Sequence, residues 1–238
     1  MIPDVRKKKI LEYMAEKDVV YISDLAEELE FSLSTIRRDL KSLEQDGDVV
    51  LLRGGAARVR SQGYDEPVVK KKLINSEAKE IIARKAAELI EDGDCIYVDS
   101  ETTTAALLKY LSGKNITIVS SSTQLMDYMP IKGAKCILLG GEVRDDLESV
   151  YGALTEKMIA SMYFDKAFIG ANGYVEDGGV YTYDHREARK KEIVKEYAKE
   201  TYLLMDTTKK NKYAFAKVFD LDECTLITEL DEANSSKK

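Results

Sequence analysis

STIRRDLKSLE, residues 34–44, combines apolar positions at helical spacing with basic side chains on the remaining faces. Ile36, Leu40 and Leu43 fall on one stripe of a helix, and Ser32 or Ser34 can cap its first turn. The major groove of DNA admits an α-helix, and short polar or basic side chains near the start of that helix reach base edges and phosphates. We therefore expect this stretch to be a recognition helix.

The residues around this helix complete a small module. Apolar residues near a 3.6-residue period predict a helix over 5–15, and Ser23 is expected to cap a second helix over 24–29. The recognition helix should end near Asp46-Gly47. The branched run 49–52 is typical of a strand, and Arg53-Gly54-Gly55-Ala56 of a tight hairpin return. Residues 1–57 thus predict a winged helix-turn-helix DNA-binding domain.

Arg37 and Arg38 are adjacent, so they cannot face the same way along a helix. We assign one to base edges, where it can bind guanine in a bidentate manner, and the other to phosphate, and the sequence leaves open which is which. The hairpin arginine is a candidate for a phosphate or the minor groove. The plainer alternative is a helical subdomain whose arginines are merely solvated. The candidate DNA contacts are Ser34, Thr35, Arg37, Arg38, Lys41 and Arg53.

Net charge alone argues mildly against a nucleic-acid partner, since the 238-residue chain carries −7. Residues 1–60 hold 11 basic and 12 acidic side chains, so DNA affinity must come from their arrangement. The basic residues cluster at 6–9, 37–41 and 53–60, whereas acidic ones concentrate at 24–30. Local field rather than bulk charge is the relevant quantity.

Composition narrows the class of protein further. The start of the chain has no apolar stretch of the signal-peptide kind, and no apolar run approaches the ~20 residues of a membrane span. Cys95, Cys136 and Cys224 are too few and too scattered for a disulfide framework or a zinc site. We expect a cytoplasmic protein without membrane partner, metal or cofactor.

A second domain follows a segment without periodicity. Residues 58–76 are expected to form the linker and the approach to this domain, residues 77–230 the domain itself, and residues 231–238 a disordered tail. A helical pattern over 77–90 precedes alternating strands and helices, which predict an α/β domain with an open, mostly parallel sheet. The expected strands are 95–98, 116–119, 136–139, 166–169, 201–205 and 225–228.

Turns rich in small polar residues follow five of these strands. Parallel sheets bind ligands at the carboxyl ends of their strands, where such turns direct backbone N–H groups toward anions. Each turn alone is weak evidence, since small polar residues are common in any loop. Five in the same topological position predict an anion-binding edge. The turns are residues 98–104, 120–123, 140–141, 170–173 and 206–209.

ISDLAEEL (22–29), STIRRDLKSLE (34–44) and LLRGGA (51–56) resemble the helix-turn-helix and wing of the DeoR family of bacterial regulators. The resemblance continues through residues 79–83, 94–103, 138–141, 165–170 and 206–209. In that family the second domain is a Rossmann-like domain that resembles ribose phosphate isomerase type A and the CoA transferases. It binds a phosphorylated sugar or similar metabolite that alters binding to double-stranded operator DNA, and repression is the usual outcome.

The resemblance implies roles for particular residues. Lys71, Lys79 and Lys209 would hold a phosphate, and Asp206 would accept a hydrogen bond from a sugar hydroxyl. Thr102, Thr103, Ser121 and Gly141 would be neutral donors, with Asp99, Ser100 and Gly140 in the same turns.

One residue departs from the family pattern, because Glu101 stands where the family usually has glycine. A carboxylate in that turn would repel a phosphate unless it points away or pairs with a lysine. Ser121 also differs, since asparagine is common nearby. Together these changes imply an unusual effector or a weakened site.

Two other readings of the second domain stay open. An enzyme could use Glu101, Asp99, Asp206, Lys209 and the single histidine, His185, for proton transfer on a sugar phosphate, although no nucleophile, base and orienting group stand in a recognisable arrangement. Alternatively, the domain could serve only for oligomerisation. We favour a regulator without catalytic residues. A homo-oligomer is expected, since one small module rarely supplies enough affinity, with the linker as its hinge.

Overall fold

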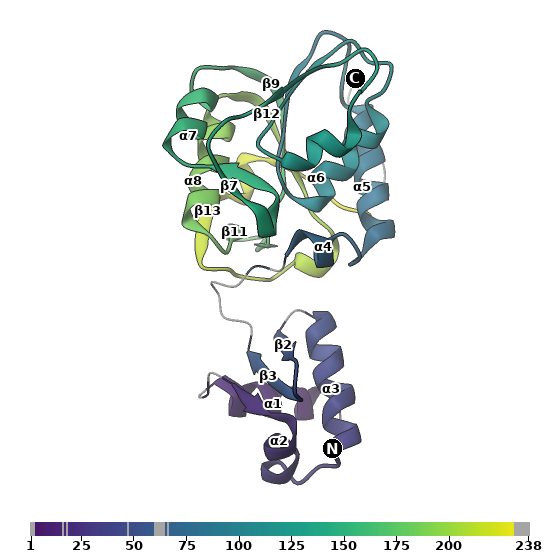
Figure 1. Cartoon of the computed structure of the whole chain (residues 1–238), viewed down its shortest axis with the longest axis vertical. Coiled ribbons are helices and arrows are strands. Elements are labelled where there is room, and N and C mark those ends of the chain that lie inside the picture. The colour runs from purple at the N-terminus through teal and green to yellow at the C-terminus, as the bar shows by residue number, and fades with distance from the viewer. Residues whose placement is uncertain are drawn as a thin grey trace. The chain divides into compact units, whose positions relative to one another are not determined.

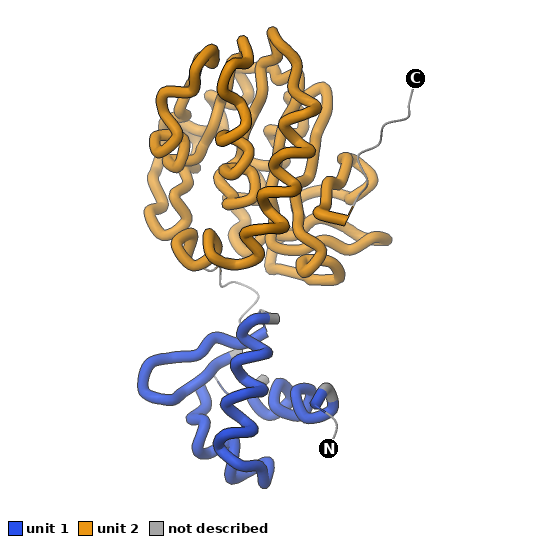
Figure 2. The backbone as a smooth tube through the Cα atoms, turned by 90° about the vertical axis from the view of Figure 1, so that its right-hand side faces the viewer, with its two compact units in different colours: residues 1–64 blue, residues 65–238 orange. Residues whose placement is uncertain are grey.

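The computed structural model describes residues 3–15, 17, 19–46, 48–59, 65 and 67–230. The chain divides into two compact units, residues 1–64 and residues 65–238, which Figure 2 shows in blue and orange. The expected linker between 58 and 67 lies in part, and the expected disordered tail wholly, outside the described residues.

The first unit has the helices and the small sheet of a winged helix-turn-helix (Figure 1). Its strands form an antiparallel sheet in the order β1-β3-β2, so a two-residue strand before the second helix adds to the expected hairpin. Gly54 and Gly55 turn the hairpin with φ of 89° and 78°, a region that favours glycine. The elements are α1 (Pro3–Ala15), β1 (Val20–Tyr21), α2 (Ile22–Glu28), α3 (Leu33–Asp46), β2 (Val49–Leu52) and β3 (Ala56–Val59).

The apolar stripe predicted for the third helix forms the centre of this unit. Ile36 and Leu40 are fully buried and pack with Ile10 and Met14 of α1. One detail of the prediction is wrong: α2 begins at Ile22, its N-cap is Tyr21, and no side chain caps it. Ser23 lies inside the helix because the extended backbone of β1 runs directly into its first turn.

The second unit is built on a six-stranded sheet in the order β14-β12-β9-β4-β5-β6, and every neighbouring pair is parallel. This confirms the predicted α/β class and the six strands. The strands are β4 (Cys95–Val98), β5 (Thr117–Ser120), β6 (Lys135–Leu138), β9 (Phe164–Ile169), β12 (Ala198–Leu204) and β14 (Thr225–Ile227).

Helices cover both faces of this sheet, because successive side chains of a strand point to opposite faces. Ile96 and Val98 of β4 pack in one core with α5 (Ser76–Glu88) and α6 (Thr102–Leu107). Tyr97 points the other way, into a second core with α7 (Ala153–Ile159) and α8 (His185–Glu196). Figure 1 shows these two helix pairs on opposite sides of the strands.

Two small antiparallel pieces complete the unit, and the sequence did not reveal them because their strands are short and broken by turns. β10 (Gly173–Tyr174), β11 (Gly179–Thr182) and β13 (Ala216–Asp220) form a sheet, and β7 (Glu142–Arg144) pairs with β8 (Ser149–Tyr151). A short helix, α4 (Val68–Lys71), lies within the segment expected to be linker. The 3-10 helices are η1 (Leu108–Tyr110), η2 (Thr123–Tyr128), η3 (Asp145–Leu147), η4 (Thr207–Lys209) and η5 (Leu221–Glu223).

Across the described residues, every helix is too short or too polar to cross a membrane. The three cysteines are free thiols, each half-buried. In the same part of the chain, no group of three or more histidine, cysteine or acidic side chains has the arrangement of a metal site.

Candidate nucleic-acid interface and charged ligand site

The third helix presents the predicted polar residues on its free face. Ser34, Arg37, Arg38 and Lys41 are exposed, Thr35 is half-buried, and Arg53 is exposed in the hairpin turn. The Oγ of Ser32 accepts a hydrogen bond from the backbone N–H of Thr35 at 3.2 Å, which confirms Ser32 as the cap of α3. Its distance to Oγ1 of Thr35 is 2.8 Å. The start of α3 is therefore held firmly while its basic side chains stay available to a partner.

One predicted member of the basic cluster has a different role. Arg6 is buried, and its guanidinium donates to both carboxylate oxygens of Asp39 on α3, with Nη2 at 3.0 Å from Oδ1. The same guanidinium lies 5.5 Å from the centre of the Phe31 ring. The sequence could not show this because Asp39 is 33 positions away. Arg6 therefore orients the recognition helix rather than adding to the exposed charge.

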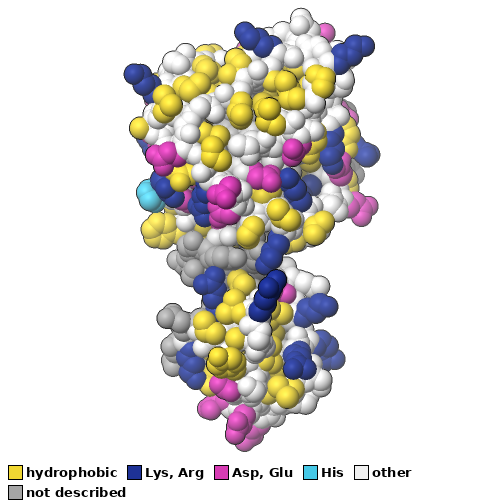
Figure 3. All heavy atoms as spheres, in the orientation of Figure 1, with side chains coloured by type: hydrophobic (Ala, Val, Ile, Leu, Met, Phe, Trp, Pro, Cys, Tyr) yellow, Lys and Arg dark blue, Asp and Glu magenta, His cyan; other side chains and the backbone are white. Residues whose placement is uncertain are grey.

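Charge in this unit is unevenly distributed. Figure 3 shows Lys and Arg side chains over much of its visible face, with acidic side chains at the end that carries α2. Asp24, Glu27 and Glu28 of α2 are exposed. Exposed positive charge is thus concentrated on α3, the hairpin and the start of α1, away from α2, as DNA binding by a net acidic protein requires.

In the second unit, the carboxyl ends of four neighbouring strands meet at one edge and bring most of the predicted polar residues together. Side chains in the turn after β4 are almost completely buried, from Asp99 at 0% exposed to Thr102 at 8%. The carboxylate of Asp99 accepts from the backbone N–H groups of Ser100 and Gly170, which ties the turn after β4 to the turn after β9. Ser100, Thr103 and Asp206 are buried at the same edge.

Glu101 is buried in this turn and paired with lysine. The Nζ of Lys71 donates to Glu101 Oε2 at 3.1 Å and to the Asp65 carboxylate at 2.8 Å. Burial raises the pKa of Glu101, but Lys71, Lys191 and Lys209 together outweigh it and hold the pKa below its usual value. Burial likewise lowers the pKa of Lys71, and its two carboxylates reverse the shift. The carboxylate is thus accommodated by pairing, and the Nζ of Lys71 is already occupied.

The close approach of Glu101 also explains a glycine. A Cβ atom added to Gly170 would lie 2.4 Å from Cβ of Glu101, which no real side chain could tolerate. A glycine after β9 therefore leaves the room that this glutamate needs.

Sequence reasoning missed the most buried cation of the site. Lys191 of α8 is fully buried, donates to the Asp99 carboxylate, and lies 3.8 Å from Glu101 Oε1. Next to it, Lys190 donates to Ser149 Oγ at 2.8 Å and pairs with Glu187 at 2.9 Å. Nothing in the charged run HREARKKEIVKE distinguishes these lysines from solvated ones. His185, by contrast, has a side chain that is 76% exposed.

Lys79 and Lys209 are held by backbone carbonyls. Lys209 Nζ donates to the Ala171 carbonyl at 2.6 Å, and Lys79 Nζ donates to the Lys71 carbonyl. Burial, with the positive charge of Lys209 next in size, lowers the pKa of Lys79 to about 8. Burial also lowers the pKa of Lys209. The carboxylates of Asp206 and Glu101 oppose both shifts without cancelling them.

We call the ten charged groups of this edge the charge cluster. It contains as many lysines as carboxylates, so it is balanced when all are charged. Its members are Lys71, Lys79, Lys190, Lys191, Lys209, Asp65, Asp99, Glu101, Glu187 and Asp206.

Three other predicted ligand residues make packing contacts. The hydroxyl oxygens of Ser121 and Tyr97 are 2.8 Å apart. The Gly140 carbonyl accepts a hydrogen bond from Thr155 Oγ1 at 2.8 Å. A Cβ atom added to Gly141 would lie 2.1 Å from Thr155 Oγ1. The close approach of Thr155 explains why position 141 is glycine, independently of any ligand.

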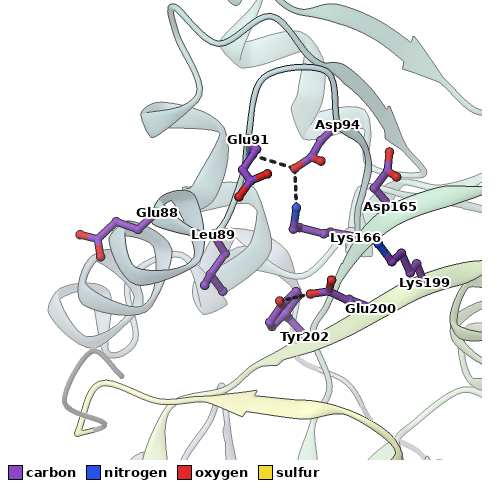
Figure 4. A pocket seen from close by; sticks show the side chains of 9 residues that line it. All are labelled: Glu88, Leu89, Glu91, Asp94, Asp165, Lys166, Lys199, Glu200 and Tyr202. Carbon is purple, nitrogen blue, oxygen red and sulfur yellow. Dashed lines mark hydrogen bonds and ion pairs between the residues drawn. The ribbon is translucent and has the colours of Figure 1, made fainter. Parts of the chain in front are cut away.

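Two pockets lie at opposite edges of the sheet. The larger, about 390 Å³, is at the amino ends of the strands, and Figure 4 shows that some of its polar side chains bind one another. Lys166 donates to Asp94 at 2.7 Å there, and Tyr202 donates to Glu200. The smaller, about 220 Å³, lies beside the charge cluster. We call it the α5–η2 pocket; it is lined by Lys72, Ser76, Lys79, Glu80, Thr102, Ala106, Lys109, Gln124 and Tyr128.

Comparison with known proteins agrees with this two-part architecture. A model of the DeoR-like helix-turn-helix domain matches residues 6–62, and a model of the DeoR C terminal sensor domain matches residues 74–230. An uncharacterized HTH-type transcriptional regulator, FruR of Bacillus subtilis, is 33% identical over 229 residues, which cover 96% of this chain and 91% of the relative.

A lactose phosphotransferase system repressor of Staphylococcus epidermidis is 31% identical over 226 residues, 93% of this chain and 90% of the relative. Among solved structures, ribose 5-phosphate isomerase A of Methanocaldococcus jannaschii is similar at a TM-score of 0.42 and 19% identity. That similarity covers 57% of this chain and 55% of the other.

Proposed function

This chain belongs to the DeoR family of transcriptional regulators, and we propose that it represses an operon of sugar metabolism until a phosphorylated sugar or related metabolite binds its second unit. It is a DNA-binding regulator rather than an enzyme, as the relatives are. The name of the lactose phosphotransferase system repressor supports the sugar-linked part of the proposal. A regulator acts where its DNA lies, so we propose a cytoplasmic location.

On the DNA side, Arg37 and Arg38 of α3 are proposed to contact the operator, one at a guanine and the other at a phosphate. Their exposure, together with the burial of Ile36 and Leu40 on the opposite stripe, supports this role. Two such modules in a homo-oligomer would read repeated half-sites, which gives the affinity that one module lacks.

The observation that carries the ligand-dependent part of this proposal concerns Asp65, which lies within the predicted hinge. Its carboxylate accepts from Lys71 at 2.8 Å and from Asn172 Nδ2 at 3.0 Å, so this segment is attached directly to the charge cluster. A ligand that rearranges the cluster therefore alters the attachment of the hinge. To release DNA, the ligand must bind the released arrangement more tightly than the DNA-bound one, since equal affinity shifts nothing.

The test begins with selection of bound DNA from genomic fragments, because the genes beside the operator identify the pathway. Fluorescence anisotropy of that operator is then measured with triose, pentose and hexose phosphates. We expect at least one to weaken binding, and Asp206→Asn to reduce its effect. Tight operator binding that no phosphate changes would favour the alternative in which the second unit serves only for oligomerisation. The balanced charge cluster fits that alternative too, because its charges are already neutralised without a bound anion.

A further inference from the structure

Gln124, which lines the α5–η2 pocket, carries a buried hydrogen-bond acceptor without a described donor. Gln124, at 2% exposed, donates from Nε2 to the Ser100 carbonyl at 2.9 Å, and this contact fixes the orientation of the amide. Its Oε1 is buried, and no described group donates to it. Leaving a buried acceptor unsatisfied is costly, so such an atom in a native protein calls for an explanation. A donor held in the pocket supplies one.

The same pocket contains a buried cation without a counter-ion. Three lysines line it, and two are paired: Lys72 with Glu148 at 2.9 Å, and Lys109 with Glu80. Lys79 is 6% exposed, and no described carboxylate lies within 4 Å of its Nζ. Its hydrogen bond to a backbone carbonyl leaves two N–H donors available. An anion in the pocket would pair directly with Lys79, which the carboxylates of the charge cluster do not contact.

A single small molecule can satisfy both groups if it carries an anionic group and a hydroxyl group. The pocket volume of about 220 Å³ is below the roughly 300–1,000 Å³ of sites for drug-sized ligands, so it suits a small metabolite. The pocket at the opposite edge differs, because its Lys166 already pairs with the Asp94 carboxylate (Figure 4).

We propose that Gln124 is the specificity-determining residue of this pocket: its Oε1 accepts a hydrogen bond from a hydroxyl of a phosphorylated sugar whose phosphate lies at Lys79. This inference rests on the proposed function, since it places the effector of that function. It also assigns the two ends of the ligand different partners. Gln124 discriminates hydroxylated phosphates from bare phosphate, whereas Lys79 binds either.

The experiment is isothermal titration of the full chain with inorganic phosphate and with the triose, pentose and hexose phosphates. Gln124→Met is expected to weaken the best sugar phosphate about 3- to 10-fold, the worth of one neutral hydrogen bond, and to leave inorganic phosphate unchanged. Lys79→Met is expected to weaken both about 10- to 100-fold, since it removes a charged partner. Lys85→Met is the matched control, because this α5 lysine also binds backbone carbonyls but lies outside the pocket.

The outcomes separate this inference from the proposed function. If no phosphate ester releases operator DNA but Lys79→Met still abolishes phosphate binding, the proposed function fails and the anion end of the pocket stands. If Gln124→Met weakens sugar phosphate and inorganic phosphate equally, or neither, the role of Gln124 is overturned. Failure of the wild-type chain to bind any of these probes, or a crystal structure with an enclosed water donating to Gln124 Oε1 beside bound ligand, overturns it as well.

Discussion

Replacing Glu101 with glutamine should make the second unit bind phosphorylated ligands more tightly. The carboxylate lies within the charge cluster, 3.1 Å from Lys71 Nζ and 3.8 Å from Lys191 Nζ, and its loss leaves five lysines against four carboxylates. At an effective dielectric constant of about 20, a unit charge 6–8 Å from an anion contributes roughly 2–3 kcal/mol. Allowing for screening, we expect an affinity gain of about 5- to 50-fold for a sugar phosphate.

The same substitution should cost stability. Each lysine keeps another carboxylate, Asp65 for Lys71 and Asp99 for Lys191, so we expect a loss of about 1–3 kcal/mol in the free energy of unfolding rather than the 3–5 kcal/mol of a fully broken buried pair. Because the folded pKa of Glu101 is depressed, its contribution is present above the unfolded pKa of about 4.3 and is lost as the pH falls. The variant should therefore lose less stability than wild type on acidification.

Isothermal titration with the sugar phosphates measures the affinity, and urea unfolding at pH 7 and pH 4 measures the stability. Glu187→Gln is the matched control, since it removes one carboxylate that lies between Lys190 and Lys191 and outside the turn after β4. The electrostatic reasoning is refuted if wild type binds a sugar phosphate tightly and Glu101→Gln binds it no better. An equal gain from Glu187→Gln would assign the effect to overall charge rather than to the turn.

Three further outcomes are expected. Arg37→Ala or Arg38→Ala should each weaken operator binding by about 1–3 kcal/mol if the side chain reads guanine, and unchanged anisotropy in both variants would contradict the recognition-helix assignment. Asp39→Asn should lower the melting temperature of the N-terminal unit, followed by circular dichroism, because Arg6 loses its charged partner; an unaltered melt would argue against that anchor. Phosphate affinity should fall between pH 7 and pH 9 as Lys79, with a pKa of about 8, loses its proton, and calorimetry on Lys79→Met should show no such dependence.

The parallel sheet was predictable because its strands are continuous apolar runs that end at small polar turns. The run at 95–98 is buried on both faces and so needs no alternation, which is why it was located correctly. The same logic placed Asp99 and Asp206 at one edge. The charged lining contributed by α8 was not predictable in this way, because its buried face carries Lys190 and Lys191 beside apolar residues such as Ile193. Their burial depends on carboxylates from distant turns, which no local period encodes.

The environment of Glu101 could not be predicted from residue types alone. Its charge predicts repulsion of a phosphate, and the sequence also contains the lysine that neutralises it, but Lys71 is flanked by two more lysines. Only the fold selects among them: Lys70 and Lys72 are exposed, whereas the Nζ of Lys71 is buried between Asp65 and Glu101. Lys71 lies in α4, which has only four residues, so the sequence has no helical periodicity that could show which of the three lysines is buried.

The balance of the charge cluster links phosphate binding to the predicted hinge. A dianion that enters a balanced cluster must displace a carboxylate or leave excess negative charge in a buried site, which is costly. The two carboxylates on Lys71 are unequal: burial raises the pKa of Asp65 above its usual value, whereas the lysines around Glu101 keep that pKa low. The charge of Asp65 is therefore held less favourably than that of Glu101, and Asp65 is also the one of the two that lies in the predicted hinge. Its displacement would free the segment that leads to the DNA-binding unit while Glu101 kept its place.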